Sequence, residues 1–177
     1  MALKRYVIDG YGQLELNAAA FRRSGRIEAQ CKIADGIEYI ENGMLLAVDN
    51  VERVVKYVAD GVDLPVALNY TTEHMYDDRH NALKDFKLSA GSFLPRMGYQ
   101  GAGDKYTTNC LAYDDTEFAN DEALEEAVKN VKTERLYAKA CANGAHQITK
   151  NAEGAICLVL GATTMPDGQF AVKFQAL

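Results

Sequence analysis

The stretch NYTTEHMYDDRH, residues 69–80, gathers residue types that carry acid–base and metal chemistry. It holds two of the chain's three histidines, together with Glu73, Asp77 and Asp78. Imidazole and carboxylate groups bind metal ions and transfer protons. This stretch is therefore the first place in the sequence to test for an active site, and the test is whether the spacing suits the chemistry.

His74 and His80 are poorly spaced for binding one metal ion. Two histidine ligands on a helix stand four residues apart, as in H-E-x-x-H, whereas these stand six apart. On a strand they would share a face but lie about 20 Å from each other, and only a tight turn at Asp77–Asp78 brings them together. We therefore expect no metal site and no cofactor, and we expect these polar side chains to bond local backbone at the end of a strand.

No other pattern predicts catalysis. GYQGAGDKYTT resembles a phosphate loop, but Asp104 separates the last glycine from Lys105, and a strand-like segment follows where phosphate binding needs a helix. The chain has no G-x-S-x-G and no C-x-x-C, so its four distant cysteines are expected to be buried thiols of a reducing compartment. We expect no catalytic residue and a non-enzymatic protein. One alternative stays open, a small enzyme whose unrecognised site uses Glu73–His80 and Lys105.

The length of 177 residues fits one domain, or one domain with an arm. No run approaches the roughly 18 apolar residues of a membrane span, and the first ten residues lack the apolar core of a signal peptide. The net charge of −6 argues against general nucleic-acid binding. The charge is uneven, because residues 1–34 hold six Lys/Arg against three acids, which leaves −9 for the remainder.

Residues 1–34 are predicted to form an N-terminal arm, broken by Gly10, Gly12 and Gly25. Much of this arm is expected to reach away from the body and dock on a neighbouring subunit or another protein. Within it, LKRYVI favours a short strand and RIEAQCKI a half-buried strand, while LNAAAFRR favours one or two helical turns capped by Asn17. Its candidate partner-binding residues are Arg22, Arg23 and Arg26.

Residues 35–177 are predicted to form a β-rich body. The sequence indicates a hairpin across Asp49–Val51, a strand over LPVALNY in which Pro65 suits an edge strand or a strand start, and a strand over KYTTNCLAY. A helix is expected near residues 120–132 and a C-terminal hairpin over 155–176, turning at Pro-Asp-Gly. With eight to ten short strands, the expected fold class is mainly β. It is an antiparallel β-barrel or sandwich with one inserted helix and an extended N-terminal arm.

A series of short segments in this order resembles a group of small virion structural proteins of tailed bacteriophages. The matching segments are LN (Leu16–Asn17), ENGML (Glu41–Leu45), EHMYD (Glu73–Asp77), LKDF (Leu83–Phe86), GDKYTTN (Gly103–Asn109) and PDGQFAVK (Pro166–Lys173). The resemblance covers the whole chain, and the ordered series carries it rather than any single motif. The chain departs from the pattern at His74, where the family has arginine, at Tyr106, where it has phenylalanine, and in two extra polar residues after Asp77.

The resemblance implies a capsid decoration or cement protein that binds the major capsid protein shell and copies of itself, located in the virion after assembly in the host cytoplasm. It implies structural roles for Asn42, Gly43, Met44, Glu73, Tyr76, Asp77, Gly103, Asp104, Thr107, Thr108, Asn109, Pro166, Asp167 and Gly168. A symmetric oligomer is expected on such a shell. A head–tail connector or tail component is the alternative within the same class.

Overall fold

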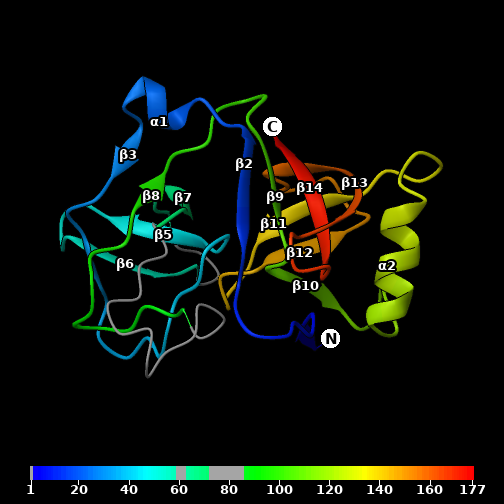
Figure 1. The fold of residues 1–177 in the computed structure, drawn as a ribbon, viewed down its shortest axis with the longest axis horizontal. Helices are drawn as coiled ribbons and strands as arrows, with labels where there is room; N and C mark the ends of the chain where they lie inside the picture. The colour runs from blue at the N-terminus through cyan, green and yellow to red at the C-terminus, as the bar shows by residue number, and fades with distance from the viewer. Residues whose placement is uncertain (1, 59–62, 72–85) are drawn as a thin grey trace.

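The computed structural model describes residues 2–58, 63–71 and 86–177, and the described chain is mainly β. It holds fourteen strands and two helices in two sheets (Figure 1). The elements are β1 (Leu3–Arg5), β2 (Leu14–Ala18), α1 (Phe21–Ser24), β3 (Ile27–Glu28), β4 (Lys32–Ile33), β5 (Leu45–Asp49), β6 (Val54–Tyr57), β7 (Val66–Asn69), β8 (Met97–Gly98), β9 (Lys105–Thr108), β10 (Leu111–Asp114), α2 (Asp121–Lys129), β11 (Tyr137–Ala140), β12 (His146–Thr149), β13 (Cys157–Thr164) and β14 (Phe170–Ala176).

The eight-stranded sheet has the order β1-β10-β12-β11-β13-β14-β9-β2, and the six-stranded sheet has the order β3-β8-β7-β5-β6-β4. Most pairs are antiparallel, but β10 pairs with β12 and β4 pairs with β6 in parallel, so both sheets are mixed. The mainly β prediction is confirmed. Neither sheet is a closed barrel, because each ends in two edge strands, and the two sheets form a sandwich-like arrangement.

Both sheets curl strongly, because strands far apart in each sheet are joined by short links in the chain. In the larger sheet, β10 and β9 stand five positions apart, which is about 24 Å in a flat sheet. Only Asn109 and Cys110 separate them in the chain, and such a link spans about 11 Å at most. In the smaller sheet, β3 and β4 are also five positions apart and are joined by only three residues. Each sheet must therefore bend back until its far strands approach each other.

Each curled sheet encloses apolar side chains. Tyr106, Ile148 and Phe174 are buried in the larger sheet's cluster, and Met44, Leu46 and Met97 in that of the smaller sheet. All five residues of β5 are buried, because Leu45 faces the larger sheet's cluster while Leu46 faces its own. Each sheet with its cluster forms one lobe of the molecule. The two lobes therefore share an apolar contact along β5 and the neighbouring β7.

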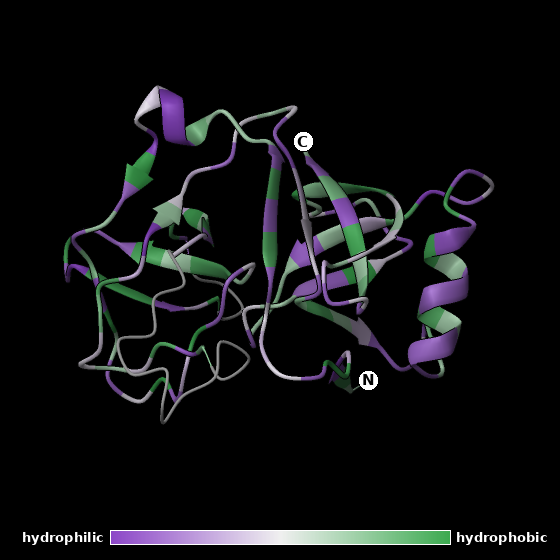
Figure 2. Cartoon of the chain, in the orientation of Figure 1, coloured by the Kyte–Doolittle hydropathy of each residue, from purple (hydrophilic) through white to green (hydrophobic). Residues whose placement is uncertain are grey.

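The helix α2 matches the helix predicted near residues 120–132 and covers the outer side of the larger sheet (Figure 1). The side chain of Asn120 accepts the Ala123 backbone N–H and caps the helix start. Hydrophobic and hydrophilic residues alternate along α2 (Figure 2), and Leu124 and Val128 are buried on the face toward the sheet. The inserted helix is thus confirmed, and α1 is a second, four-residue helix.

Residues 1–34 do not form the predicted arm that leaves the body. Their strands β1, β2, β3 and β4 are hydrogen-bonded to body strands, and they are the four edge strands of the two sheets. Phe21 is fully buried against Tyr70. The prediction failed because an edge strand pairs on one side only and needs few buried side chains, so its sequence looks like that of a polar, glycine-broken tail.

Three local predictions are corrected. Asn17 is not a helix cap but belongs to β2, and the short helix α1 ends at Gly25, which has a left-handed φ of 71°. RIEAQCKI divides into β3 and β4, on opposite edges of the smaller sheet. KYTTNCLAY likewise divides into β9 and β10, because the chain bends at Asn109–Cys110.

The two predicted hairpins are confirmed. β5 pairs antiparallel with β6 across the turn after Asp49, and β13 pairs antiparallel with β14 across Pro166–Gly168. Gly168 has φ 90°, a left-handed conformation that glycine adopts without steric cost.

Replacing Gly168 with valine should lower the free energy of unfolding by about 1 kcal/mol or more, because a β-branched residue is strained at positive φ. A Cβ at this position would have nothing within 4 Å, so the cost comes from the backbone alone. Urea unfolding measures it. Gly168→Asn is the matched control and should cost less, since asparagine tolerates the left-handed region. Equal stability of wild type and the valine variant would refute this explanation.

Candidate functional site

Only the first three residues of NYTTEHMYDDRH, Asn69–Thr71, are described, and they hold the fold. Asn69 is fully buried; its side-chain N–H donates to the Glu41 carbonyl at 2.8 Å, and its Oδ1 accepts the Thr71 hydroxyl at 2.6 Å. The predicted residues Glu73, His74, Tyr76, Asp77 and His80 lie outside the described residues. Among those described, no group of three or more His, Cys, Asp or Glu side chains could hold a metal ion.

The segment GDKYTTN instead holds residues 5–20, called the N-terminal segment below, onto the body. The Asp104 carboxylate accepts the Ala20 N–H at 2.8 Å, and the Thr107 hydroxyl donates to the Asn17 side chain at 2.8 Å. Asp104 is only 4% exposed and also accepts the Gly101 N–H. These contacts fix residues 17–20 beside β9. Gly103 has φ 90° in the turn that leads into this strand.

The next two residues of the same segment hold Tyr11 and Gln13. The Thr108 hydroxyl donates to the Gln13 carbonyl at 2.7 Å. Asn109 accepts the Gln13 N–H at 2.7 Å and donates to the Tyr11 carbonyl at 3.3 Å. We call the side chains of Asp104, Thr107, Thr108 and Asn109 the clamp. Because Gln13 and the clamp asparagine are buried, the clamp supplies bonds that water cannot.

A partly buried ion pair joins the N-terminal segment to the ENGML motif. The Glu41 carboxylate contacts the Arg5 guanidinium at 3.2 Å and accepts the Gly12 N–H at 3.0 Å. Glu41 is 3% exposed. The thiol of Cys110 lies 3.3 Å from Arg5 and donates to the Asn42 carbonyl at 3.0 Å. This cluster ties both sheets and the N-terminal segment together at one point.

Two glycines allow these backbone segments to approach each other closely. A Cβ on Gly43 would lie 2.0 Å from the Thr108 hydroxyl oxygen, and the backbone there has φ 81°. A Cβ on Gly12 would lie 2.4 Å from the Cys110 sulfur and 2.8 Å from the Asn42 carbonyl. Both positions therefore require glycine for packing.

The C-terminal hairpin turn contributes to the same region. Asp167 accepts the Gln13 side-chain N–H at 2.5 Å, and Gln169 exchanges hydrogen bonds with the Asp9 backbone. Residues from ENGML, GDKYTTN and PDGQFAVK, which are far apart in sequence, thus converge on the N-terminal segment, which itself carries LN. Met44 packs in the smaller sheet's core beside them.

A second polar cluster lies inside the larger sheet, and sequence reasoning missed it. The Tyr106 hydroxyl lies 2.8 Å from His146 Nε2 and 3.0 Å from the Cys157 sulfur, and His146 stacks on Phe174. Nothing in the local pattern marks these residues, because 40 residues or more separate Tyr106 from each partner.

These groups are neutral at physiological pH. Burial lowers the pKa of His146 to about 3 and raises the pKa of Cys157 to about 11. Burial also raises the pKa of the Cys110 and Cys141 thiols to about 11. Because the thiolate is the nucleophilic form of cysteine, burial keeps these thiols in their weakly nucleophilic protonated form.

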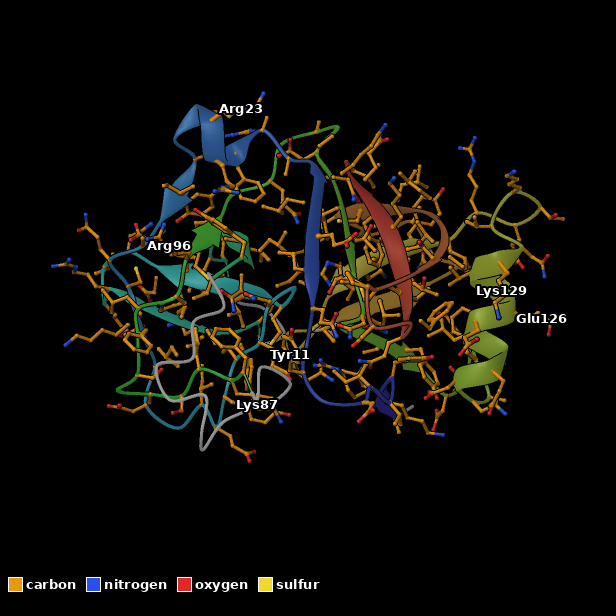
Figure 3. The ribbon with its side chains drawn as sticks, in the orientation of Figure 1. Tyr11, Arg23, Lys87, Arg96, Glu126 and Lys129 are labelled. Carbon is orange, nitrogen blue, oxygen red and sulfur yellow. The ribbon has the colours of Figure 1, made fainter. Side chains whose placement is uncertain are left out.

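The three arginines predicted to bind a partner are not equivalent. Arg26 is engaged within the chain: its guanidinium lies 3.6 Å from the Asp104 carboxylate and donates to the Ser24 hydroxyl at 3.1 Å. The Arg22 guanidinium lies 5.9 Å from the centre of the Tyr70 ring. Arg23 lies on the outer surface of α1 (Figure 3). The other open candidate, Lys105, is half-buried in β9 between two paired strands.

Compared with known proteins, the chain matches no family model, no curated protein and no solved structure. In the part of the chain that the structure describes, no helix is long and apolar enough to cross a membrane.

Replacing Gly43 with alanine should destabilise the protein by about 2 kcal/mol more than replacing Gly103 with alanine. Both glycines have positive φ, so both variants bear the backbone strain, but only the Gly43 variant meets Thr108. Urea unfolding of the two variants compares them directly. Similar losses in both would show that the close approach at Gly43 does not limit packing.

Stability should fall in mild acid because of His146. Its folded pKa, about 3, lies below its ordinary value of 6.5, so the unfolded chain takes up a proton that the folded chain excludes. The loss begins as pH falls below about 6.5 and reaches about 2 kcal/mol by pH 5. His146→Gln, whose amide can still accept from Tyr106, should lose about this much less stability between pH 8 and pH 5. The double variant His74→Gln/His80→Gln is the control for the other histidines, and identical pH profiles of wild type and His146→Gln would contradict the assignment.

Proposed function

We propose that this chain is a non-enzymatic structural protein of a tailed-bacteriophage virion, a decoration protein that binds the shell of the major capsid protein. The observation that supports it is the convergence of four resembling segments on one junction. Asn17, Gly43, Asp104, Thr108 and Asp167 all contact the N-terminal segment or the residues that hold it. Side chains of the shared motifs hold one segment of this chain against another, as expected of a structural family.

The surface chemistry fits a protein partner. Arg22 and Arg23 remain available for carboxylates of a shell protein, whereas Arg26 serves the chain's own Asp104. Each exposed pair contributes about 1 kcal/mol or less, but a symmetric shell repeats the contact many times. The partners proposed are therefore the major capsid protein and other copies of this chain, with no role for nucleic acid, membrane or cofactor.

Purified protein incubated with expanded empty capsids should sediment with them. The protein counted in purified virions should be present in hundreds of copies, because a decoration protein follows the shell lattice. A dozen copies or fewer would identify a connector or tail component instead. No sedimentation, combined with a stoichiometric metal detected by elemental analysis, would favour the enzyme alternative.

The histidines of the opening stretch should be dispensable for this binding. His74→Ala with His80→Ala should sediment with capsids as wild type does, because the proposal assigns them no chemistry. Loss of binding by a variant that melts like wild type would show that these histidines contact the partner.

A further inference from the structure

The strand β2 leaves one side of its backbone unpaired. It is an edge strand of the larger sheet, and it lies between the two lobes (Figure 1). The Gln13 N–H and carbonyl both bond clamp side chains on the β9 side. Because backbone groups alternate in direction along a strand, the N–H and carbonyl of Leu14 point to the opposite, open side. An open side of this kind can pair with another extended chain.

Two grooves are lined in part by residues of β2. One has a volume of about 270 Å³ and is lined by Leu14, Leu16, Tyr70, Arg22 and Arg96 among others. The second, of about 760 Å³, continues along residues 16–20 to Arg22 and Arg23. Apolar side chains and guanidinium groups therefore flank the same strand edge.

The cations of these grooves lack ion-pair partners within the described residues. Arg26, Lys56 and Lys129 each contact a carboxylate, but Arg22, Arg23 and Arg96 do not. Several other exposed cations of the described chain, such as Lys4, also have no ion pair, so what distinguishes these three arginines is their position in the two grooves. The edge strand itself has one charged residue, Glu15, and no proline that would block pairing.

We infer that the open edge of β2 docks an extended acidic segment of a protein partner by strand addition. Backbone groups of the segment pair with Leu14, its apolar side chains contact Leu16 and Tyr70, and its carboxylates meet Arg22, Arg23 and Arg96. This inference rests on the proposed function for the partner, which is then the shell protein. A nucleic acid offers phosphates to the arginines but no alternating amides to the strand, so a polypeptide fits the groove better.

The probe for this site is a fluorescein-labelled heptapeptide of alternating glutamate and valine. Fluorescence anisotropy should show binding to wild type. The triple variant Arg22→Ser/Arg23→Ser/Arg96→Ser should bind it about tenfold or more weakly. The matched control, Lys4→Ser/Lys132→Ser/Arg135→Ser, removes the same charge from other exposed positions and should bind within about twofold of wild type. Hydrogen exchange of residues 11–20 should slow when the peptide is bound.

Three other probes make the result specific. The alternating lysine–valine peptide and the glutamate–valine peptide N-methylated at alternate residues should bind at least about tenfold more weakly, because one lacks the charge and the other cannot pair as a strand. Equal binding of the N-methylated peptide, or tighter binding of a single-stranded oligonucleotide, would overturn strand addition. Capsid sedimentation separates the two proposals. If wild type fails to sediment but binds the peptide, the virion role fails alone; if it sediments and the triple variant does so equally, the docking site fails alone.

Discussion

The polar backbone of residues 11–20 must find hydrogen-bond partners where it passes into the body, and the rest of the structure depends on how it does so. An unpaired buried N–H or carbonyl costs free energy comparable to a lost hydrogen bond. Strand pairing with β9 satisfies part of the segment. The clamp side chains satisfy the ends of the strand, where regular pairing stops at Gln13 and Ala20. Because β2 is short, its ends need the clamp side chains Asp104, Thr108 and Asn109 as hydrogen-bond partners.

The clamp also explains the shape of the larger sheet. The same chain that carries Thr108 and Asn109 bends immediately after them and enters β10, on the other end of the sheet order. The bend curls the sheet around Tyr106 and Phe174, and it brings Cys110 against the Asn42 carbonyl of the other lobe. Gly12 and Gly43 have no Cβ, so three chain segments can meet at this point. One short segment thus sets the curl of one sheet and the contact between both.

Sequence reasoning identified the elements that have strong local signals. The helix after Asn120 has a cap and an apolar stripe, and the C-terminal hairpin has a Pro-Asp-Gly turn, so both were predictable. The bend at Asn109–Cys110 was not, because period-two alternation continues through it. The edge role of residues 1–34 was hidden too, since what pairs with β1 or β2 depends on residues about 100 positions away. The motif residues were found by resemblance, but their shared contact to the N-terminal segment is visible only in three dimensions.

The origin of all four edge strands in the first 33 residues has a consequence for the order in which the protein is made. Leu14 leaves the ribosome 94 residues before its partner Thr108, a wait of roughly 5 to 20 s at about 5–20 residues per second. The larger sheet is continuous only after β14, which ends at Ala176, has been added between β13 and β9. The strands β1 and β2 therefore remain unpaired until β10 and β9, roughly a hundred residues later, have been made. A nascent segment that is basic and interrupted by glycines remains hydrated during that wait, so the features that make it resemble a loose tail keep it available until its partners exist.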